Sequence, residues 1–110
     1  MKLSILDGTG ASQTILTAAQ EAVVDHSSTI AATGTPQNAL VANVNRSGYF
    51  FQNLSATNPM YLNELGIATT GSGSIKVPAG GTFPPAGYPV STGALSILGT
   101  AADGYTCSEW

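Results

Sequence analysis

Few side chains in this sequence could carry out nucleophilic or acid–base chemistry. His26 is the single histidine and Cys107 the single cysteine. A serine or cysteine nucleophile needs a base beside it, so a catalytic triad here would depend on His26 alone, in the least regular segment of the chain. Cys107 has no basic neighbour in sequence, which is typical of a small strand residue rather than a reactive thiol. We interpret both as structural residues.

Paired carboxylates could serve a glycosidase. The nearest pair, Glu21 and Asp25, lies four residues apart on a candidate helix, where like charges are typical of a solvated face. Glu64 and Glu109 lie in strand-like segments of unknown separation. The run 71–76 (GSGSIK) lacks phosphate-loop spacing and leads into a strand, so it indicates a turn. We predict no catalytic residues, no metal site and no cofactor, and therefore no enzyme.

The composition narrows the possible partners. The chain has 110 residues, of which 8% are charged, against 24 Ser and Thr, 13 Gly and 6 Pro. Lys2, Arg46 and Lys76 are far apart on a chain of net charge -3, whereas binding to phosphates needs clustered cations. We therefore exclude a nucleic-acid partner. A hydrophobic content of 43% also argues against disorder.

Membrane insertion and secretion are not expected either. No window approaches the roughly 18–20 apolar residues of a membrane span. Residues 1–8 (MKLSILDG) reach an acid and a turn residue after a short apolar run, which predicts no signal peptide. The glycosylation patterns at 45–47 and 53–55 are interpreted as chance matches. One cysteine forms no internal disulfide, so core packing or subunit association must stabilise the domain.

Short apolar or alternating runs separated by turn residues predict an all-β fold. The strongest strand signals begin at residue 39, where Leu40, Ala42 and Val44 share one face of a predicted strand. Such strands at intervals of roughly 8–12 residues favour a small antiparallel β-sandwich or barrel-like domain. The remaining predicted strands cover 49–54, 60–65, 74–78, 82–83, 94–98 and 105–110.

The N-terminal part is less regular. Asp7-Gly8 between apolar runs predicts a hairpin near residues 3–17. Residues 17–25 are the one candidate helix, about two turns long. Residues 26–38 are polar and rich in turn formers, which indicates a loop or extended arm. We thus predict an N-terminal hairpin or arm over residues 1–38 and a β-sandwich domain over residues 39–110.

Aromatic side chains are candidates for contact with other molecules. Tyr49, Phe50 and Phe51 are adjacent, so a strand there would place them on both faces of a sheet. We favour core or subunit-interface roles over a ligand platform. The interface candidates are Tyr49, Phe51, Tyr88 and Trp110.

Four runs carry a resemblance to a known family: RSGYFFQNLS (46–55), YLNELG (61–66), GSIKVPAGG (73–81) and GALSILGTAADGYTCSEW (93–110). Together they resemble a family of small structural proteins of tailed-bacteriophage virions. The resemblance covers residues 39–110 and, loosely, the first dozen residues. Residues 18–38 carry no match. The family offers no catalytic residue to transfer.

The resemblance implies a capsid decoration (cement) protein, located in the virion, that binds and stabilises the head shell through the major capsid protein. We expect a homo-oligomer, with a trimer favoured, because symmetric copies multiply weak contacts. We also expect residues 18–38 to form an arm that orders on the capsid or on a neighbouring subunit. The alternative is a tail, neck or fibre-associated subunit whose Tyr49, Phe51, Tyr88 and Trp110 face a host glycan or receptor.

Overall fold

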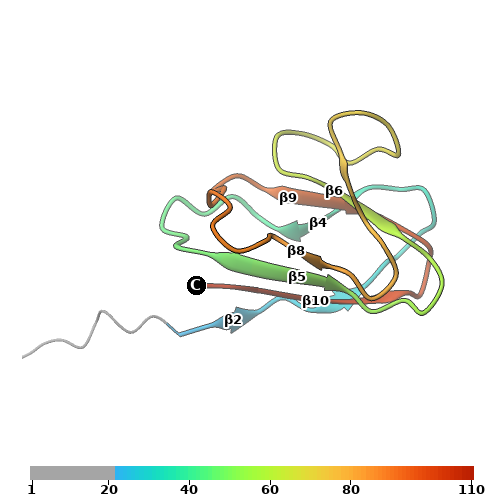
Figure 1. The fold of residues 1–110 in the computed structure, drawn as a ribbon, viewed down its shortest axis with the longest axis horizontal. Helices are drawn as coiled ribbons and strands as arrows, with labels where there is room; N and C mark the ends of the chain where they lie inside the picture. Colours follow the sequence, from blue (N-terminus) through green and yellow to red (C-terminus); the bar gives the residue numbers. More distant parts are fainter. Residues whose placement is uncertain (1–21) are drawn as a thin grey trace, which may run out of the picture.

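The protein is an antiparallel β-sandwich in a computed structural model that describes residues 22–110. Figure 1 shows the two sheets as stacked layers, with β4, β6 and β9 in one and β2, β5 and β10 in the other. The all-β prediction is confirmed. The strands are β2 (Val24–Asp25), β3 (Ser28–Thr29), β4 (Gln37–Leu40), β5 (Tyr49–Asn53), β6 (Met60–Asn63), β7 (Ile75–Val77), β8 (Thr82–Phe83), β9 (Leu95–Leu98) and β10 (Gly104–Glu109).

The strand order sets which residues share a face. The first sheet has the order β2-β10-β5-β8, and β3 also pairs with β10. The second sheet has the order β4-β9-β6-β7. The chain therefore crosses between the sheets repeatedly, and β9 and β10 lie in different sheets although a short turn joins them. Within the described residues, no helix is long and apolar enough to cross a membrane.

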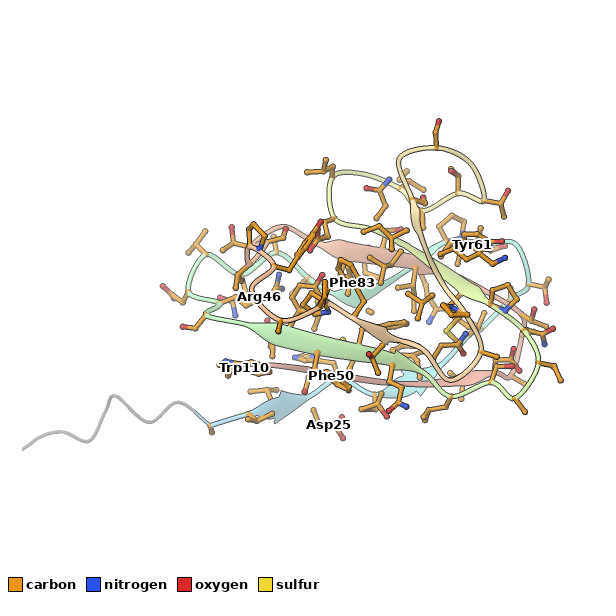
Figure 2. The ribbon with its side chains drawn as sticks, viewed as in Figure 1. Asp25, Arg46, Phe50, Tyr61, Phe83 and Trp110 are labelled. Atoms are coloured by element: carbon orange, nitrogen blue, oxygen red, sulfur yellow. The ribbon has the colours of Figure 1, made fainter. Side chains whose placement is uncertain are left out.

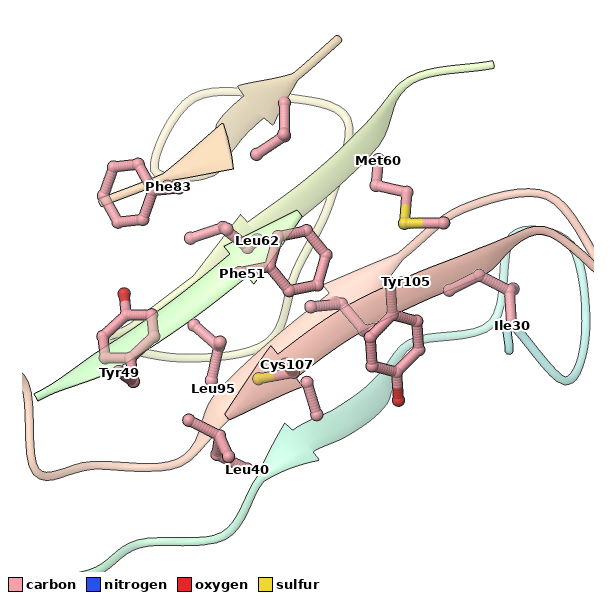
Figure 3. Close-up of a cluster of buried hydrophobic side chains, with 13 residues drawn as sticks. Ile30, Leu40, Tyr49, Phe51, Met60, Leu62, Phe83, Leu95, Tyr105 and Cys107 are labelled. Atoms are coloured by element: carbon pink, nitrogen blue, oxygen red, sulfur yellow. The ribbon is translucent and has the colours of Figure 1, made fainter. Parts of the chain in front are cut away.

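The core lies between the sheets. Alternate residues of β5 and β10 point inward, as their period-two burial shows. The rings of Phe51 and Tyr105 stack at 5.5 Å between centroids. Figure 3 shows them with side chains from the opposite sheet, among them Met60, Leu62 and Leu95. Burial of these apolar side chains supplies the main driving force for folding.

The outer side of β9, in the second sheet, is covered by the chain itself. All four residues of β9 are buried: Leu95 and Ile97 belong to the core between the sheets, and the loop over residues 64–74 contacts the outer side of the strand at Ser96. Figure 1 shows this loop above β6 and β9. The backbone N–H of Ala68 in that loop donates to Oγ of Ser96 in β9 at 3.0 Å. Beside the loop, a cavity of about 420 Å³ is lined by Pro36, Gln37, Asn38, Ile67 and Ser96, all neutral.

Asn53 joins the two sheets at one end of the sandwich. Its Nδ2 donates to the carbonyl oxygens of Asn58 at 2.8 Å and Val77 at 3.1 Å, and its Oδ1 accepts from the N–H of Ser55. The side chain is fully buried, so the glycosylation pattern at 53–55 has no accessible acceptor. Buried backbone carbonyls that would otherwise lack a partner are satisfied in this way.

Where the structure describes the N-terminal part of the chain, the predictions for that part need correction. The predicted hairpin over 3–17 lies outside the described residues, as does most of the predicted helix over 17–25. The remaining part of that helix is wrong: Val24–Asp25 is a strand paired with β10. A two-turn helix has little stability of its own, and pairing with β10 provides backbone hydrogen bonds instead.

The predicted arm also lies partly within the sandwich. Residues 28–29 pair with β10, and β4 begins at Gln37, so the expected boundary at residue 38 falls inside a strand. The strand predicted from residue 39 ends at Leu40 rather than continuing to Val44. The pairing register of β4 shifts between Asn38 and Leu40, and the chain then turns, which leaves Val44 85% exposed.

Candidate interaction surface

A buried network of hydrogen bonds surrounds Arg46, the chain's only arginine. Its Nε donates to Oε1 of Glu109 at 2.8 Å. Its Nη1 donates to the carbonyl oxygens of Ser91 and Gly93, and its Nη2 to that of Val41, all within 2.8 Å. One side chain thus ties three segments together, and both members of the ion pair are buried.

Glu109 is held ionised by this network. Burial alone would raise its pKa, but hydrogen bonds from Arg46 and Asn43, together with the charges of Arg46 and His26, hold the pKa below its ordinary value of 4.5. Nε2 of His26 lies 2.8 Å from the second carboxylate oxygen, a close contact without hydrogen-bond alignment. His26 therefore belongs to a structural network at the edge of the first sheet.

Cys107 is buried between the sheets. Burial raises the pKa of its thiol to about 12, although the charge of Arg46 opposes the change. A thiol with this pKa stays protonated at neutral pH and is a weak nucleophile. Within residues 22–110, no group of three or more His, Cys, Asp or Glu side chains is placed to hold a metal ion.

Glu64 and Glu109 bind different partners, and Glu21 of the other pair considered in the sequence lies outside the described residues. Glu64 accepts hydrogen bonds from the hydroxyls of Tyr49 and Tyr88, whereas Glu109 is paired with Arg46. Burial, aided by the hydrogen bond and charge of Glu64, raises the pKa of Tyr49 far above its ordinary value. The tyrosine therefore remains a neutral donor that positions the carboxylate.

The four interface candidates separate into two groups. Tyr49 and Phe51 point into the core and are 4% and 0% exposed. Their burial within a single chain removes them from the residues that can touch a partner. Tyr88 and Trp110 are 39% and 40% exposed, so they stay available. Strand alternation explains this outcome, since Tyr49 and Phe51 occupy inward positions of β5 and Phe50 the outward position between them.

Trp110 lies on the outer face of the first sheet. Its backbone N–H donates to the carbonyl of Gly48, and the N–H groups of Ser47 and Gly48 donate to the carbonyl of Trp110. The indole lies directly over Gly48, where a Cβ would come within 2.6 Å of the ring. Glycine is therefore required at this position for the ring to pack closely on the backbone.

The pairing register of β10 with β2 and β5 places further side chains on the same outer face as Trp110. Ser108 pairs with Phe50 on one side and with Asp25 on the other, and directly paired residues share a face. Trp110 follows Ser108 by two positions and so points the same way. Figure 2 shows Trp110, Phe50 and Asp25 at this outer side of the sheet. We call the residues Asp25, Phe50, Ser108 and Trp110 the outer patch.

The sheet edges around the outer patch are poorly suited to strand addition. β2 and β3 are two-residue strands separated by His26 and Ser27, where the N–H of Cys107 donates to the Ser27 hydroxyl instead of a backbone carbonyl. At the opposite edge, β8 also has two residues and runs into Pro84 and Pro85. Short, interrupted and proline-flanked edges prevent edge-to-edge pairing, so contact through the face is favoured.

Sequence reasoning missed the roles of Arg46 and Phe50. The scarcity of charge was the available signal for Arg46, because a lone arginine in a charge-poor chain is a candidate for a buried pair. The partner Glu109, 63 positions away, could not be identified from spacing. Phe50 could be separated from Tyr49 and Phe51 only once the inward face of β5 was known.

Comparison of the chain with protein-family models, with curated proteins and with solved structures found no match.

Proposed function

We propose that this protein is a structural component of a bacteriophage virion, a decoration (cement) protein that binds the head shell through the outer patch and stabilises it. The observation that carries the proposal is the exposed aromatic pair, Trp110 and Phe50, on a sheet face that no other described segment covers. Exposed aromatic side chains on a face that is otherwise poor in large and charged side chains are typical of protein interaction sites.

The charge distribution supports adhesion rather than chemistry. Residues 22–110 contain six charged side chains, and two of them, Arg46 and Glu109, neutralise each other inside the protein. Stripping water from a charge on binding is costly, whereas Ser, Thr and apolar groups lose little. A surface of this composition can be covered by another protein at low desolvation cost.

A decoration protein also acts in many copies. Symmetric subunits repeat the same weak contact, so the total affinity for a shell far exceeds that of one subunit. We propose a trimer bound at three-fold or quasi-three-fold points of the capsid, in contact with the major capsid protein. On this proposal the protein is a virion component that is assembled in the host cytoplasm and has no enzymatic role.

The test is binding of the purified full chain to undecorated capsids, measured by co-sedimentation. We expect Phe50→Ser combined with Trp110→Ser to lower occupancy at least about tenfold, since buried aromatic anchors dominate interfaces. Leu65→Ser is the matched control: Leu65 is 97% exposed on the loop over residues 64–74, and its variant should bind normally. Equal occupancy of the parent protein, the double variant and the Leu65 variant would contradict the proposal.

A second candidate function keeps the virion but places the protein at the tail, neck or fibre, where it binds a host glycan or receptor. Exposure of Tyr88 and Trp110 is the observation in its favour, although the other two aromatics assigned to that role are buried. The number of copies per particle separates the two functions. A handful of copies, together with glycan binding that Tyr88→Ala abolishes, would favour the tail.

A further inference from the structure

The outer patch combines two aromatic rings with one carboxylate. Phe50, Ser108 and Asp25 lie side by side across β5, β10 and β2, and Trp110 continues the row along β10 by one outward position. Phe50 and Trp110 are 36% and 40% exposed, and Asp25 is exposed. Because β10 lies between β2 and β5, the backbones at Asp25 and Phe50 are two strand spacings of about 4.8 Å apart, roughly 10 Å in all. A long ligand side chain that lies over Ser108 can bridge the carboxylate and a ring.

Asp25 is held in place and charged. Its Oδ1 accepts a hydrogen bond from the N–H of Ser27 at 2.9 Å. Hydrogen bonds from the Ser27 side chain and backbone lower the pKa of Asp25 below its ordinary value. The ion pairs within residues 22–110 both belong to Glu109. Among those residues, Asp25 thus presents a negative charge without a cationic partner.

The described part of the chain does not supply a lysine or arginine to this face, and Nε2 of His26, the residue next to Asp25, lies against the carboxylate of Glu109. Arg46 is buried at the end of the sandwich, and Lys76 lies on β7 in the other sheet. A negative charge beside exposed aromatic faces is complementary to a guanidinium group, which is planar, weakly hydrated, and able both to stack on a ring and to pair with a carboxylate. An ammonium group makes the same charge contact but stacks less well.

We propose that the outer patch binds an arginine side chain of the partner protein, stacked against Phe50 or Trp110 and paired with Asp25. This inference rests on the proposed function, because it names the chemistry that the patch recognises on the capsid surface. It also predicts that binding weakens as salt is raised, since exposed charge pairs are screened.

The test uses the full-length ¹⁵N-labelled protein and two capped tripeptides, acetyl-Ala-Arg-Ala-amide and the same peptide with citrulline in place of arginine. Citrulline keeps the shape of arginine and removes its charge. We expect the arginine peptide to shift the amide signals of Asp25 and Phe50 and the indole signal of Trp110. The citrulline peptide should bind at least about threefold more weakly. Equal shifts with both peptides, or none with either, would overturn the proposal.

Two variants sharpen the result. Asp25→Asn should weaken binding of the arginine peptide about three- to fivefold, with no effect on the citrulline peptide. Asp103→Asn removes the same charge at the other end of β10, where Asp103 accepts a hydrogen bond from Asn58, and should leave binding unchanged. Equal weakening by both variants would indicate a general charge effect and contradict the specific site.

The capsid assay separates the two proposals. Normal capsid occupancy for Asp25→Asn, with loss of occupancy for the Phe50 and Trp110 double variant, would refute the arginine contact and leave the decoration role standing. Selective binding of the arginine peptide without any binding to capsids would support the recognition chemistry and refute the decoration role.

Discussion

The two sheets differ in how their outer faces are treated. In the second sheet, β9 is buried at all four positions, because Leu95 and Ile97 face the core and the loop over residues 64–74 binds Ser96 on the outer side. In the first sheet, β10 alternates between buried and half-exposed positions, and its outward side chains meet no covering segment in the described part of the chain. Within the described residues, the chain therefore covers the outer side of β9 and leaves the outer side of β10 open.

The buried network around Arg46 adds to this difference between the two faces. Arg46 and Glu109 hold the last residues of β10 against the loops around Val41 and Ser91, which fixes the adjacent Trp110 over Gly48. A ring fixed before contact loses little conformational entropy when a partner covers it. The buried network is therefore expected to support the exposed patch.

The largest effect is expected from breaking that network. Arg46→Met leaves the buried carboxylate of Glu109 without its cation, which should lower the free energy of unfolding by about 3–5 kcal/mol. Urea unfolding followed by fluorescence measures the change. Lys76→Met, which removes the same charge from an exposed position, should change it by less than about 0.5 kcal/mol. A similar small change for both would show that Arg46 is not structurally important.

Substitutions of two neighbouring residues of β5 allow the core to be compared with the outer patch. Phe51→Ala should destabilise the protein by about 3–5 kcal/mol because it opens a cavity between the sheets. Phe50→Ala, one residue away on the outward face, should cost less than about 1 kcal/mol but should impair capsid binding. Thermal unfolding and co-sedimentation of both variants check this. Comparable destabilisation by the two changes would contradict the assignment of faces.

Substitutions of two serines, one on each outer face, allow a direct comparison of the two faces. Ser96→Ala removes the acceptor for the buried N–H of Ala68 and should cost about 1–2 kcal/mol, with faster hydrogen exchange at the Ala68 amide. Ser108→Ala on the outer patch should stay within about 0.5 kcal/mol of the parent protein. Unchanged exchange at Ala68 would mean that the loop does not depend on this contact.

The smallest expected effect is the change in stability with pH. The pKa of Glu109 is lower in the folded protein than its ordinary value of 4.5. Stability from this group is therefore fully present above pH 4.5 and is lost as the pH falls through the folded-state pKa. We expect the midpoint of urea unfolding to decrease below about pH 4.5, and Glu109→Gln to decrease less over the same range. Equal slopes for the two proteins would assign the acid sensitivity to other groups.

Much of the fold could be predicted because the strands of residues 49–110 have strong local signals. Turn residues bracket each of them, and the alternation in β10 matches its burial. The segment around Asp25 could not be predicted, since its strand depends on a partner more than eighty positions away. The extent of β4 was overestimated because Val41 and Val44 look like strand residues in isolation, although they lie in a turn that Arg46 anchors.

The candidate site was harder to predict. Trp110 and Tyr88 were identified from residue type alone, whereas the choice between Phe50 and Phe51 needed the direction of the core. Asp25 gained its place beside Phe50 only through the pairing of β2, β10 and β5. Local sequence patterns therefore identified which side chains were unusual, and the strand order decided which of them lie together.

A density map of an intact particle that contains this protein tests the central claim most directly. We predict many copies on the head shell, in simple stoichiometric ratio to the major capsid protein. The outer patch should lie against the shell, with an arginine side chain of the shell at Asp25. A few copies at the tail or neck, or an outer patch that faces solvent while the loop over residues 64–74 makes the contact, would contradict it.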